Sequence, residues 1–170
     1  MQDIQEHKLG ATKELLTLES VEDHRRVATA MAQQAGRTLH IFTYDLEAQV
    51  FDTPEFEEAV SQLARSSQYA AVRILVQDSS RAVKNGHRLI NLAQRLSSKI
   101  EIRKPIAEYA DVTRAFFVVD ETGYISRALA DRFESVANFD DRLTSRDLVA
   151  FFNEVWERSQ QDPQLRRLYL

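Results

Sequence analysis

The chain has no cysteine among its 170 residues. It therefore has no disulfide framework, no thiolate metal site and no cysteine nucleophile. No apolar run approaches the roughly 18 residues that a membrane-spanning helix needs. The first residues lack the charged and apolar regions of a signal peptide, and there is no internal repeat, low-complexity stretch or long linker. These absences predict a cytoplasmic protein of bacterial type with no membrane span.

The composition is that of an ordinary globular domain. Hydrophobic residues make up 44% of the chain and charged residues 28%, and a chain of this length buries roughly 70% of its unfolded surface on folding. The net charge is −4, which argues against a broad nucleic-acid-binding face but leaves room for a local basic groove. Arginine outnumbers lysine 17 to 5; arginine suits bidentate phosphate contacts, and it is also common in GC-rich genomes.

Helical and strand patterns alternate along the chain. Capping signals and apolar stripes predict four main helices. One starts at Ser20 with Asp23 in a partial capping box, one starts at Thr53 and Pro54, one runs through Leu89–Leu96 after a break at Gly86, and one starts at Thr144 with Asp147 in a capping box. Apolar runs predict strands at 39–44, 71–76, 100–102 and 135–139. This order indicates right-handed crossovers and a mostly parallel sheet, to which a late hairpin adds an antiparallel part.

That hairpin, Thr113–Arg127, is the most informative stretch of the chain. It reads TRAFFVVDETGYISR, an apolar strand, a Glu-Thr-Gly turn and a second strand. In its surroundings it resembles the active-site hairpin of the phospholipase D-like superfamily, whose motif is His, any residue, Lys, four residues and Asp, followed by a Gly-Ser pair. If Asp120 is the motif Asp, the His position holds Thr113, the Lys position holds Ala115 and the Gly-Ser pair falls on Arg127 and Ala128.

The resemblance extends over about residues 38–159 and implies a fold. That fold is an α/β sandwich with a mixed, largely parallel sheet flanked by helices, here with an extra N-terminal helix. We expect an N-terminal arm over 1–19, one domain over 20–158 and a C-terminal tail over 159–170. A flavodoxin-like three-layer sheet also fits the order of elements before Pro105. The family joins two motif copies in one active site, and because this chain has one copy, the resemblance implies a homodimer.

The resemblance also bears on activity. The family splits phosphodiesters through a phospho-histidine, with lysine holding phosphoryl oxygens. Thr113 has no base beside it in the hairpin, and Ala115 cannot replace a lysine charge. We therefore assign no catalytic residue, no metal and no cofactor, and lean against an enzyme.

Two pairs of residues are candidates for binding an anion or other ligand. His87 and Arg88 follow Asn85 and Gly86 and are expected to start a helix, where phosphate or carboxylate is favoured; the alternative is a surface pair that caps a turn. Asp45 and Asp78 lie at the predicted carboxyl ends of strands, where ligands of open α/β sheets bind. Aspartate is equally common as a turn or N-cap residue.

Other polar and aromatic residues have simpler interpretations. Asp120 is expected to bond turn backbone or to form a structural ion pair with Arg114 or Arg127. Arg114 and Asp120 are also the two remaining ligand-binding candidates. No histidine pair has metal-site spacing. The aromatic residues are expected to form core rather than a base-stacking platform; they are Phe116, Phe117, Phe151, Phe152 and Trp156. Arg166 and Arg167 in the tail are candidates for docking a protein partner, or part of a frayed end.

Three hypotheses for function follow. The first is a non-catalytic phospholipase D-like domain that binds a phosphate-bearing ligand or a protein partner in the bacterial cytoplasm. The second is a phosphodiesterase or nuclease-type hydrolase with an active site rebuilt around His87, Arg88 and the strand-end aspartates. The third, which the net charge disfavours, is a nucleic-acid-binding protein with a local arginine groove. The sequence names no substrate, partner or pathway.

Overall fold

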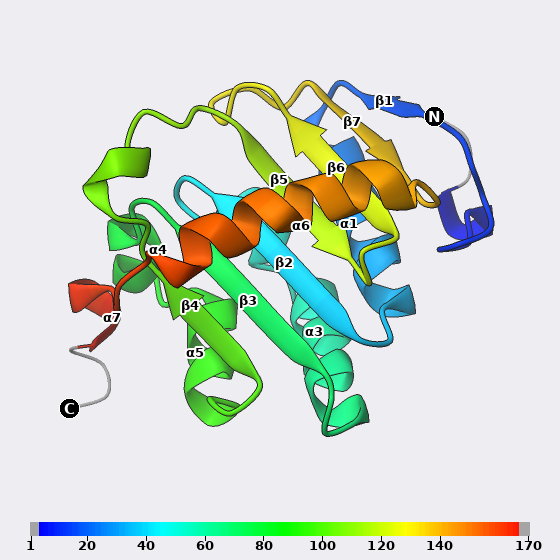
Figure 1. Ribbon diagram of the computed structural model, residues 1–170. Coiled ribbons are helices and arrows are strands. Elements are labelled where there is room, and N and C mark those ends of the chain that lie inside the picture. Colours follow the sequence, from blue (N-terminus) through cyan, green and yellow to red (C-terminus); the bar gives the residue numbers. More distant parts are fainter. Residues whose placement is uncertain (1–3, 167–170) are drawn as a thin grey trace.

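The computed structural model describes residues 4–166, and one seven-stranded sheet runs through this part of the chain (Figure 1). Its strand order is β1-β7-β6-β5-β2-β3-β4. The strands are β1 (Leu16–Leu18), β2 (Thr38–Thr43), β3 (Ala71–Val76), β4 (Ile100–Arg103), β5 (Ala115–Val119), β6 (Gly123–Arg127) and β7 (Ser135–Asn138). The predicted strands and the predicted hairpin are all present.

The sheet is mixed, as predicted, but most of its strand pairs are antiparallel. Strands β2, β3 and β4 are parallel to one another, whereas β5 lies antiparallel beside β2 and the β5–β6–β7–β1 half is antiparallel throughout. The expectation of a largely parallel sheet was wrong because four of the six neighbouring strand pairs are antiparallel and only two are parallel. The antiparallel pairing of β5 with β2 also excludes the flavodoxin-like alternative, whose strands are all parallel in a doubly wound order.

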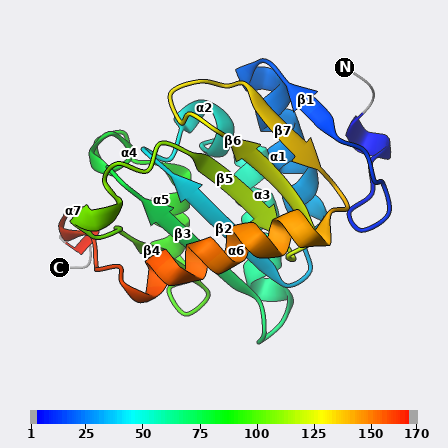
Figure 2. The same ribbon diagram turned by 45° about the horizontal axis from the view of Figure 1, so that its top comes forward.

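The helices form two layers of unequal size. The α-helices are α1 (Val21–Gln34), α2 (Ala48–Phe51), α3 (Pro54–Ser66), α4 (Ser80–Lys84), α5 (Arg88–Arg95), α6 (Arg142–Glu157) and α7 (Pro163–Arg166), and the short 3₁₀ helices are η1 (Ile4–Glu6) and η2 (Ala107–Tyr109). Helices α1, α3 and α5 cover one face of the sheet, and α6 alone crosses the other (Figures 1 and 2). The helix expected as an N-terminal addition is α1, which packs beside α2 and α3 within the larger layer.

Two separate apolar cores lie on the two sides of the sheet. The larger core, between the sheet and α1, α3 and α5, includes Met31, Phe56 and Phe117. The smaller core lies under α6 and includes Phe116 and Phe152. The alternation of Phe116 and Phe117 along β5 sends one ring to each core. The aromatic residues are therefore core, as predicted, although Phe151 is only half-buried.

Side-chain caps set the helix starts. The Ser20 hydroxyl accepts from the Asp23 amide at 3.1 Å, and Thr53 accepts from the Phe56 amide at 3.1 Å, as the sequence predicted. Helix α6 starts earlier than expected: its N-cap is Asp141, whose carboxylate accepts from the Thr144 amide at 3.0 Å. Thr144 thus lies inside the first turn.

The two ends of the chain are tied to the sheet. Within the expected arm 1–19, Leu16–Leu18 form edge strand β1, and Ile4 is buried. In the expected tail, Asp162 accepts a 2.5 Å hydrogen bond from Ser79, and Lys104 pairs with Gln160. Arg167 lies outside the described residues. None of the helices in residues 4–166 is long and apolar enough to cross a membrane.

Candidate functional site

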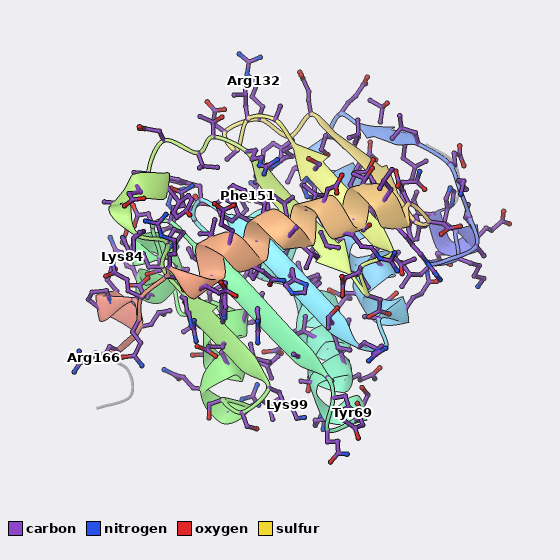
Figure 3. All side chains as sticks on the ribbon, viewed as in Figure 1. Tyr69, Lys84, Lys99, Arg132, Phe151 and Arg166 are labelled. Carbon is purple, nitrogen blue, oxygen red and sulfur yellow. The ribbon has the colours of Figure 1, made fainter. Side chains whose placement is uncertain are left out.

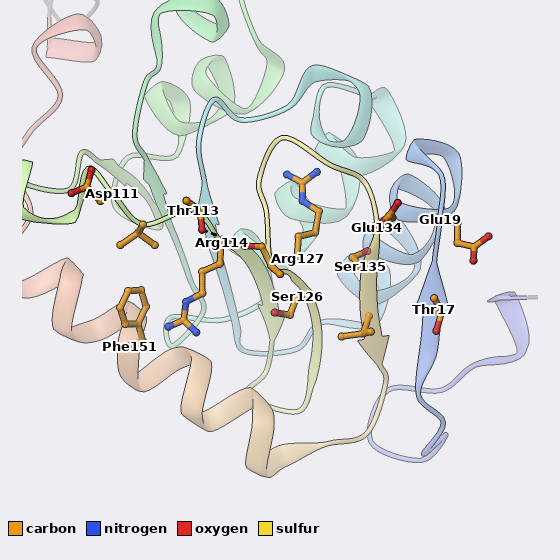
Figure 4. A pocket seen from close by; sticks show the side chains of 13 residues that line it. Thr17, Glu19, Asp111, Thr113, Arg114, Ser126, Arg127, Glu134, Ser135 and Phe151 are labelled. Atoms are coloured by element: carbon orange, nitrogen blue, oxygen red, sulfur yellow. Dashed lines mark hydrogen bonds between the residues drawn. The ribbon is translucent and has the colours of Figure 1, made fainter.

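The largest cavity of the described structure opens at the end of the sheet where β2 and β3 terminate. It has a volume of about 1110 Å³. The register pairs Phe42 with Phe116, which brings the carboxyl end of β2 next to the start of β5. The cavity is lined by Thr17, Glu19, Asp111, Val112, Thr113, Arg114, Ser126, Arg127, Ala128, Glu134, Ser135, Val136 and Phe151 (Figure 4). We call it the main cavity.

The main cavity lies at the open end of the β5–β6 hairpin, where the sequence places the family motif. Thr113 lies at the His position and is exposed, and its hydroxyl reaches the Ala128 carbonyl at 3.5 Å. Ala115 lies at the Lys position and is buried. Among residues 4–166, no histidine or lysine lines this cavity, so the described lining lacks the two residue types on which the family's chemistry depends.

Arg114 is the accessible cation of the main cavity. Its guanidinium stacks over Phe151 of α6 at 4.1 Å and lies 5.5 Å from the Phe116 ring centre. Figure 4 shows it pointing toward α6, and it forms no ion pair within the described residues. A half-buried arginine held on an aromatic face and without a carboxylate partner keeps its charge and donors available to an anion.

Arg127 is the second cation, and it points to the opposite face of the sheet (Figure 4). It is 2% exposed, and its Nη2 lies 2.8 Å from Glu47 Oε1. The Phe133 ring lies 5.4 Å from the guanidinium carbon. Burial raises the pKa of Glu47, while the charge of Arg127 and a hydrogen bond from Thr43 act in the other direction.

A strained turn positions Glu47 against Arg127. Leu46 adopts a left-handed conformation with φ of 59°, which is unfavourable for a leucine. The turn is held because the Thr43 hydroxyl accepts from the Leu46 amide at 3.1 Å and donates to Glu47 Oε1 at 2.9 Å. Backbone strain that the surroundings fix in this way is typical of functional sites.

Beneath Arg127 lies His24 of α1, which is 4% exposed. Burial, together with the positive charge of Arg127, lowers the pKa of His24 to about 3, so the ring is neutral at physiological pH. On the other face, burial and the charge of Arg73 lower the pKa of His40 to about 4, and the His40 ring packs edge-on against Phe152 at 4.8 Å. Both histidines are structural residues of the layers.

Asp120 lies at the other end of the hairpin, far along β5 from the main cavity. Its carboxylate accepts hydrogen bonds from the amides of Gly36, Arg37 and Thr38 at 2.8, 2.8 and 2.9 Å. The expected backbone bonding is therefore present. The expected ion pair with Arg114 or Arg127 is not, because Asp120 is at the turn and those arginines are at the open end.

His87 and Asp45 both line a second cavity of about 280 Å³, which residues of α2 and α4 also line. His87 is the N-cap of α5, and its Nδ1 accepts from the Leu89 amide at 3.1 Å. Burial is the main cause that lowers the pKa of His87. Asp45 lies 3.7 Å from Arg81. The predicted helix start at Arg88 is confirmed, and the His87 ring serves as its cap.

Arg88 and Asp78 make local contacts that account for them structurally. Arg88 Nη1 pairs with Asp52 at 3.1 Å; burial alone would raise the pKa of Asp52, but hydrogen bonds from Arg88 lower it. Asp78 accepts from the amide and hydroxyl of Ser80 at 3.0 and 2.6 Å, and these bonds lower its pKa. Of the six residues selected from the sequence, only Arg114 lines the main cavity.

The β6–β7 loop, residues 128–134, separates the two cavities. Its Ala130 amide donates to the Thr113 carbonyl at 2.6 Å, and Phe133 lines the second cavity. Arg132 points away from the protein at the loop tip, whereas Phe151 lies on α6 against the sheet (Figure 3). No group of three histidine, aspartate or glutamate side chains in residues 4–166 is arranged to hold a metal ion.

Solved structures of known proteins share this arrangement. TrmBL2, an archaeal chromatin protein whose structure shows a mode of DNA binding, is similar with a TM-score of 0.66 and 13% identity over 92% of this chain and 56% of its own. Nuc of Salmonella typhimurium, a phospholipase D family member, is similar with a TM-score of 0.61 and 11% identity over 88% of this chain and 99% of its own. NucT of Helicobacter pylori is similar with a TM-score of 0.62 and 12% identity over 88% of this chain and 100% of its own. The chain thus has a phospholipase D-like fold, as its hairpin predicted.

Residues 20–168 match a sequence family described as a domain of unknown function (DUF7931), and the chain belongs to that family. No curated protein matches the sequence. The chain spans just over half of TrmBL2, 56% of its length. At 11–13% identity these structures establish the fold and carry no activity over to this chain.

Sequence reasoning did not select Arg127 and Ser135 as site residues. Arg127 entered as an ion-pair partner for Asp120 and as the residue at the first position of the family's Gly-Ser pair, and Ser135 only as the start of a strand. The hairpin register did contain a signal for the first of these: a tight turn at 120–122 places Arg127 directly opposite Ala115. Predicting the position of Ser135 requires the register between β6 and β7. These strands are joined by a seven-residue loop, and the sequence carries no local signal for their register.

Proposed function

We propose that this protein is a non-catalytic phospholipase D-like domain of the bacterial cytoplasm that binds a phosphate-bearing ligand in the main cavity. The observation that carries the proposal is Arg114, a guanidinium without an ion-pair partner in residues 4–166 that stacks at 4.1 Å on Phe151 inside the largest cavity. Arginine presents paired donors that match phosphate oxygens. Thr113 and Ala115 support the absence of catalysis, because neither supplies a nucleophilic imidazole or a phosphoryl-binding ammonium.

The charges around the cavity favour a small ligand over a nucleic-acid strand. Three carboxylates line it beside the two arginines, namely Glu19, Asp111 and Glu134. A long polyanion would pass these carboxylates and be repelled, whereas one phosphoryl group can reach Arg114 without doing so. TrmBL2 shows that the fold is compatible with a DNA-binding protein, so duplex and single-stranded DNA belong in the test.

The direct test is titration of inorganic phosphate by calorimetry. We expect wild-type binding and a loss of about tenfold or more in affinity for Arg114→Met, because a charged hydrogen-bond donor is removed while the alkyl cover on Phe151 stays. The matched control is Arg65→Met, since Arg65 is exposed on α3 and, within the part of the chain that the structure describes, bonds only the Ser61 carbonyl of its own helix. No binding by the wild type, or equal binding by Arg114→Met, contradicts the proposal.

A thermal-shift panel then defines the ligand class. A ligand at 100 times its dissociation constant stabilises the folded state by about 2.7 kcal/mol, a rise of several degrees for a domain of this size. We expect shifts with phosphate, nucleotides or phosphorylated headgroups. A shift only with DNA or RNA that falls steeply with salt would favour the nucleic-acid alternative.

The enzymatic alternative has its own test. A phosphodiesterase rebuilt at His87 would use the second cavity of about 280 Å³, which both His87 and Asp45 line. We expect no metal-independent hydrolysis of bis(p-nitrophenyl) phosphate. Hydrolysis that disappears in His87→Ala would replace the binding proposal with a hydrolase.

The homodimer is part of the proposal. Each chain carries one copy of the motif, and apolar side chains lie exposed beside the main cavity, Leu129 at 41% and Val136 at 37%. Twofold pairing is the commonest closed assembly and would cover such a surface. Light scattering should give twice the chain mass of 19.6 kDa; a monomer at micromolar concentration would remove this part.

A further inference from the structure

A row of side chains crosses the end of the sheet on the face that α1 covers. Ala115 of β5 lies opposite Arg127 of β6. The β6–β7 register, which pairs Ser126 with Val136, continues to place Arg127 opposite Ser135. Ser135 in turn lies opposite Leu18 of β1. Directly opposed residues have Cβ atoms about 5 Å apart, so Arg127 and Ser135 are neighbours, and the small Ala115 leaves space on the other side of Arg127.

The guanidinium of Arg127 is held on two sides. Nη2 meets Glu47 at 2.8 Å, and the guanidinium carbon lies over the Phe133 ring, 5.4 Å from its centre. Its Nε is buried and has no hydrogen-bond partner in residues 4–166. Nη2 is also buried without a hydrogen bond among these residues and meets Glu47 as an ion pair, so the arginine is held in position with Nε free to donate.

Ser135 has an unused group in the same place. Its hydroxyl is buried without a hydrogen-bond partner among the described residues, and the side chain is 6% exposed. Leaving a buried donor unsatisfied costs about 1–3 kcal/mol, and folded proteins rarely keep two together without a use. Both residues line the main cavity.

We propose that Arg127 and Ser135 form an inner anchor for one phosphoryl oxygen, with Arg127 Nε and the Ser135 hydroxyl as its two donors. The inference rests on the phosphate-binding function proposed above and adds the second half of its site. Arg114 contacts the ligand from the α6 side, and the inner anchor contacts it from the α1 side. Glu47 and the strained Leu46 turn keep Arg127 in place, which makes Glu47 a positioning residue.

The test measures phosphate affinity by calorimetry in variants that keep the Glu47 ion pair. Arg127→Lys retains a positive charge beside Glu47 but removes Nε, and Ser135→Ala removes the hydroxyl. We expect each to weaken phosphate binding by about tenfold, the size of one hydrogen bond to a charged group. If both bind the same oxygen, the double variant should lose clearly less than the product of the two single losses.

Ser145→Ala is the matched control. The Ser145 hydroxyl on α6 is also buried without a hydrogen-bond partner in residues 4–166, but it does not line the main cavity. Urea unfolding should give Ser135→Ala and Ser145→Ala equal or greater stability than wild type, which shows that both fold. Only Ser135→Ala should then lose phosphate affinity.

The outcomes separate this inference from the proposed function. If wild type binds phosphate and Arg114→Met weakens it, but Arg127→Lys and Ser135→Ala bind as wild type, the inner anchor is overturned and the function stands. If wild type does not bind phosphate at all, both are overturned. A loss in Ser135→Ala and Arg127→Lys with Ser145→Ala unchanged supports the anchor.

Discussion

The two ends of the β5–β6 hairpin use their charged residues in opposite ways. At the turn, the carboxylate of Asp120 is saturated by three backbone amides of residues 36–38. At the open end, Arg114 and Arg127 keep donors that residues 4–166 do not satisfy. The turn therefore serves the fold, because it joins β5 to the start of β2, whereas the open end is where we propose that the ligand binds. A motif divided in this way can lose its catalytic residues and keep the aspartate on which folding depends.

The largest expected effect comes from disturbing the open end's buried charge. Arg127→Met leaves Glu47 without its cation, which should lower the free energy of unfolding by about 4 kcal/mol. Urea unfolding measures this loss. The double variant Arg127→Met with Glu47→Met should recover most of it, because the isolated charge is gone; equal instability of the single and double variants would show that the ion pair is not the cause.

The turn end should respond nearly as strongly, but only in stability. Asp120→Ala removes the acceptor of three charge-assisted hydrogen bonds and puts alanine at φ of 55°, so we expect a loss of about 3 kcal/mol. Asp120→Asn keeps an acceptor oxygen and tolerates this backbone conformation, so its loss should be about half as large. Phosphate affinity of the folded fraction should not change in either variant, and a change would contradict the separation of the two ends.

The sequence carried most of the fold because its signals are local. Ser20, Thr53 and Pro54 mark helix starts, and the run 115–127 predicts a tight hairpin. The site was harder to predict, since it depends on pairings that cross long loops. Asp120 looked like a partner for Arg114 or Arg127 on sequence proximity, yet the strand length of β5 keeps them at opposite ends. The direction of β5 beside β2, which made the sheet less parallel than expected, is likewise a tertiary choice.

Acid should lower the free energy of unfolding through buried histidines on both faces of the sheet. The pKa values of His24 and His40 are about 3 and 4 in the folded protein, below the usual 6.5 that both regain on unfolding. The unfolded chain therefore binds more protons between about pH 4 and 6.5, and stability falls as pH falls through that window. From pH 6.5 to 5.5 the two histidines together should cost about 2 kcal/mol.

Urea unfolding at several pH values measures this slope. His40→Phe should reduce it, and the remaining histidine contribution should come from His24 and from His87, whose pKa burial also lowers. An unchanged slope in His40→Phe would mean that other groups dominate the acid response. Since His24 lies beside Arg127, its share should also shrink in the variant that lacks both Arg127 and Glu47.

The smallest expected change in stability is at Arg114, and it sharpens the comparison most. Arg114→Met keeps alkyl packing on Phe151 and loses only a cation–π contact, so the free energy of unfolding should fall by less than about 1 kcal/mol. The same variant should lose phosphate affinity, whereas Asp120→Asn should lose stability and keep its phosphate affinity. This result would show that the fold positions Arg114 for binding and that Arg114 contributes little to the stability of the fold. If Arg114→Met proved as destabilising as Asp120→Ala, Arg114 would be a structural residue and the division between the two ends would fail.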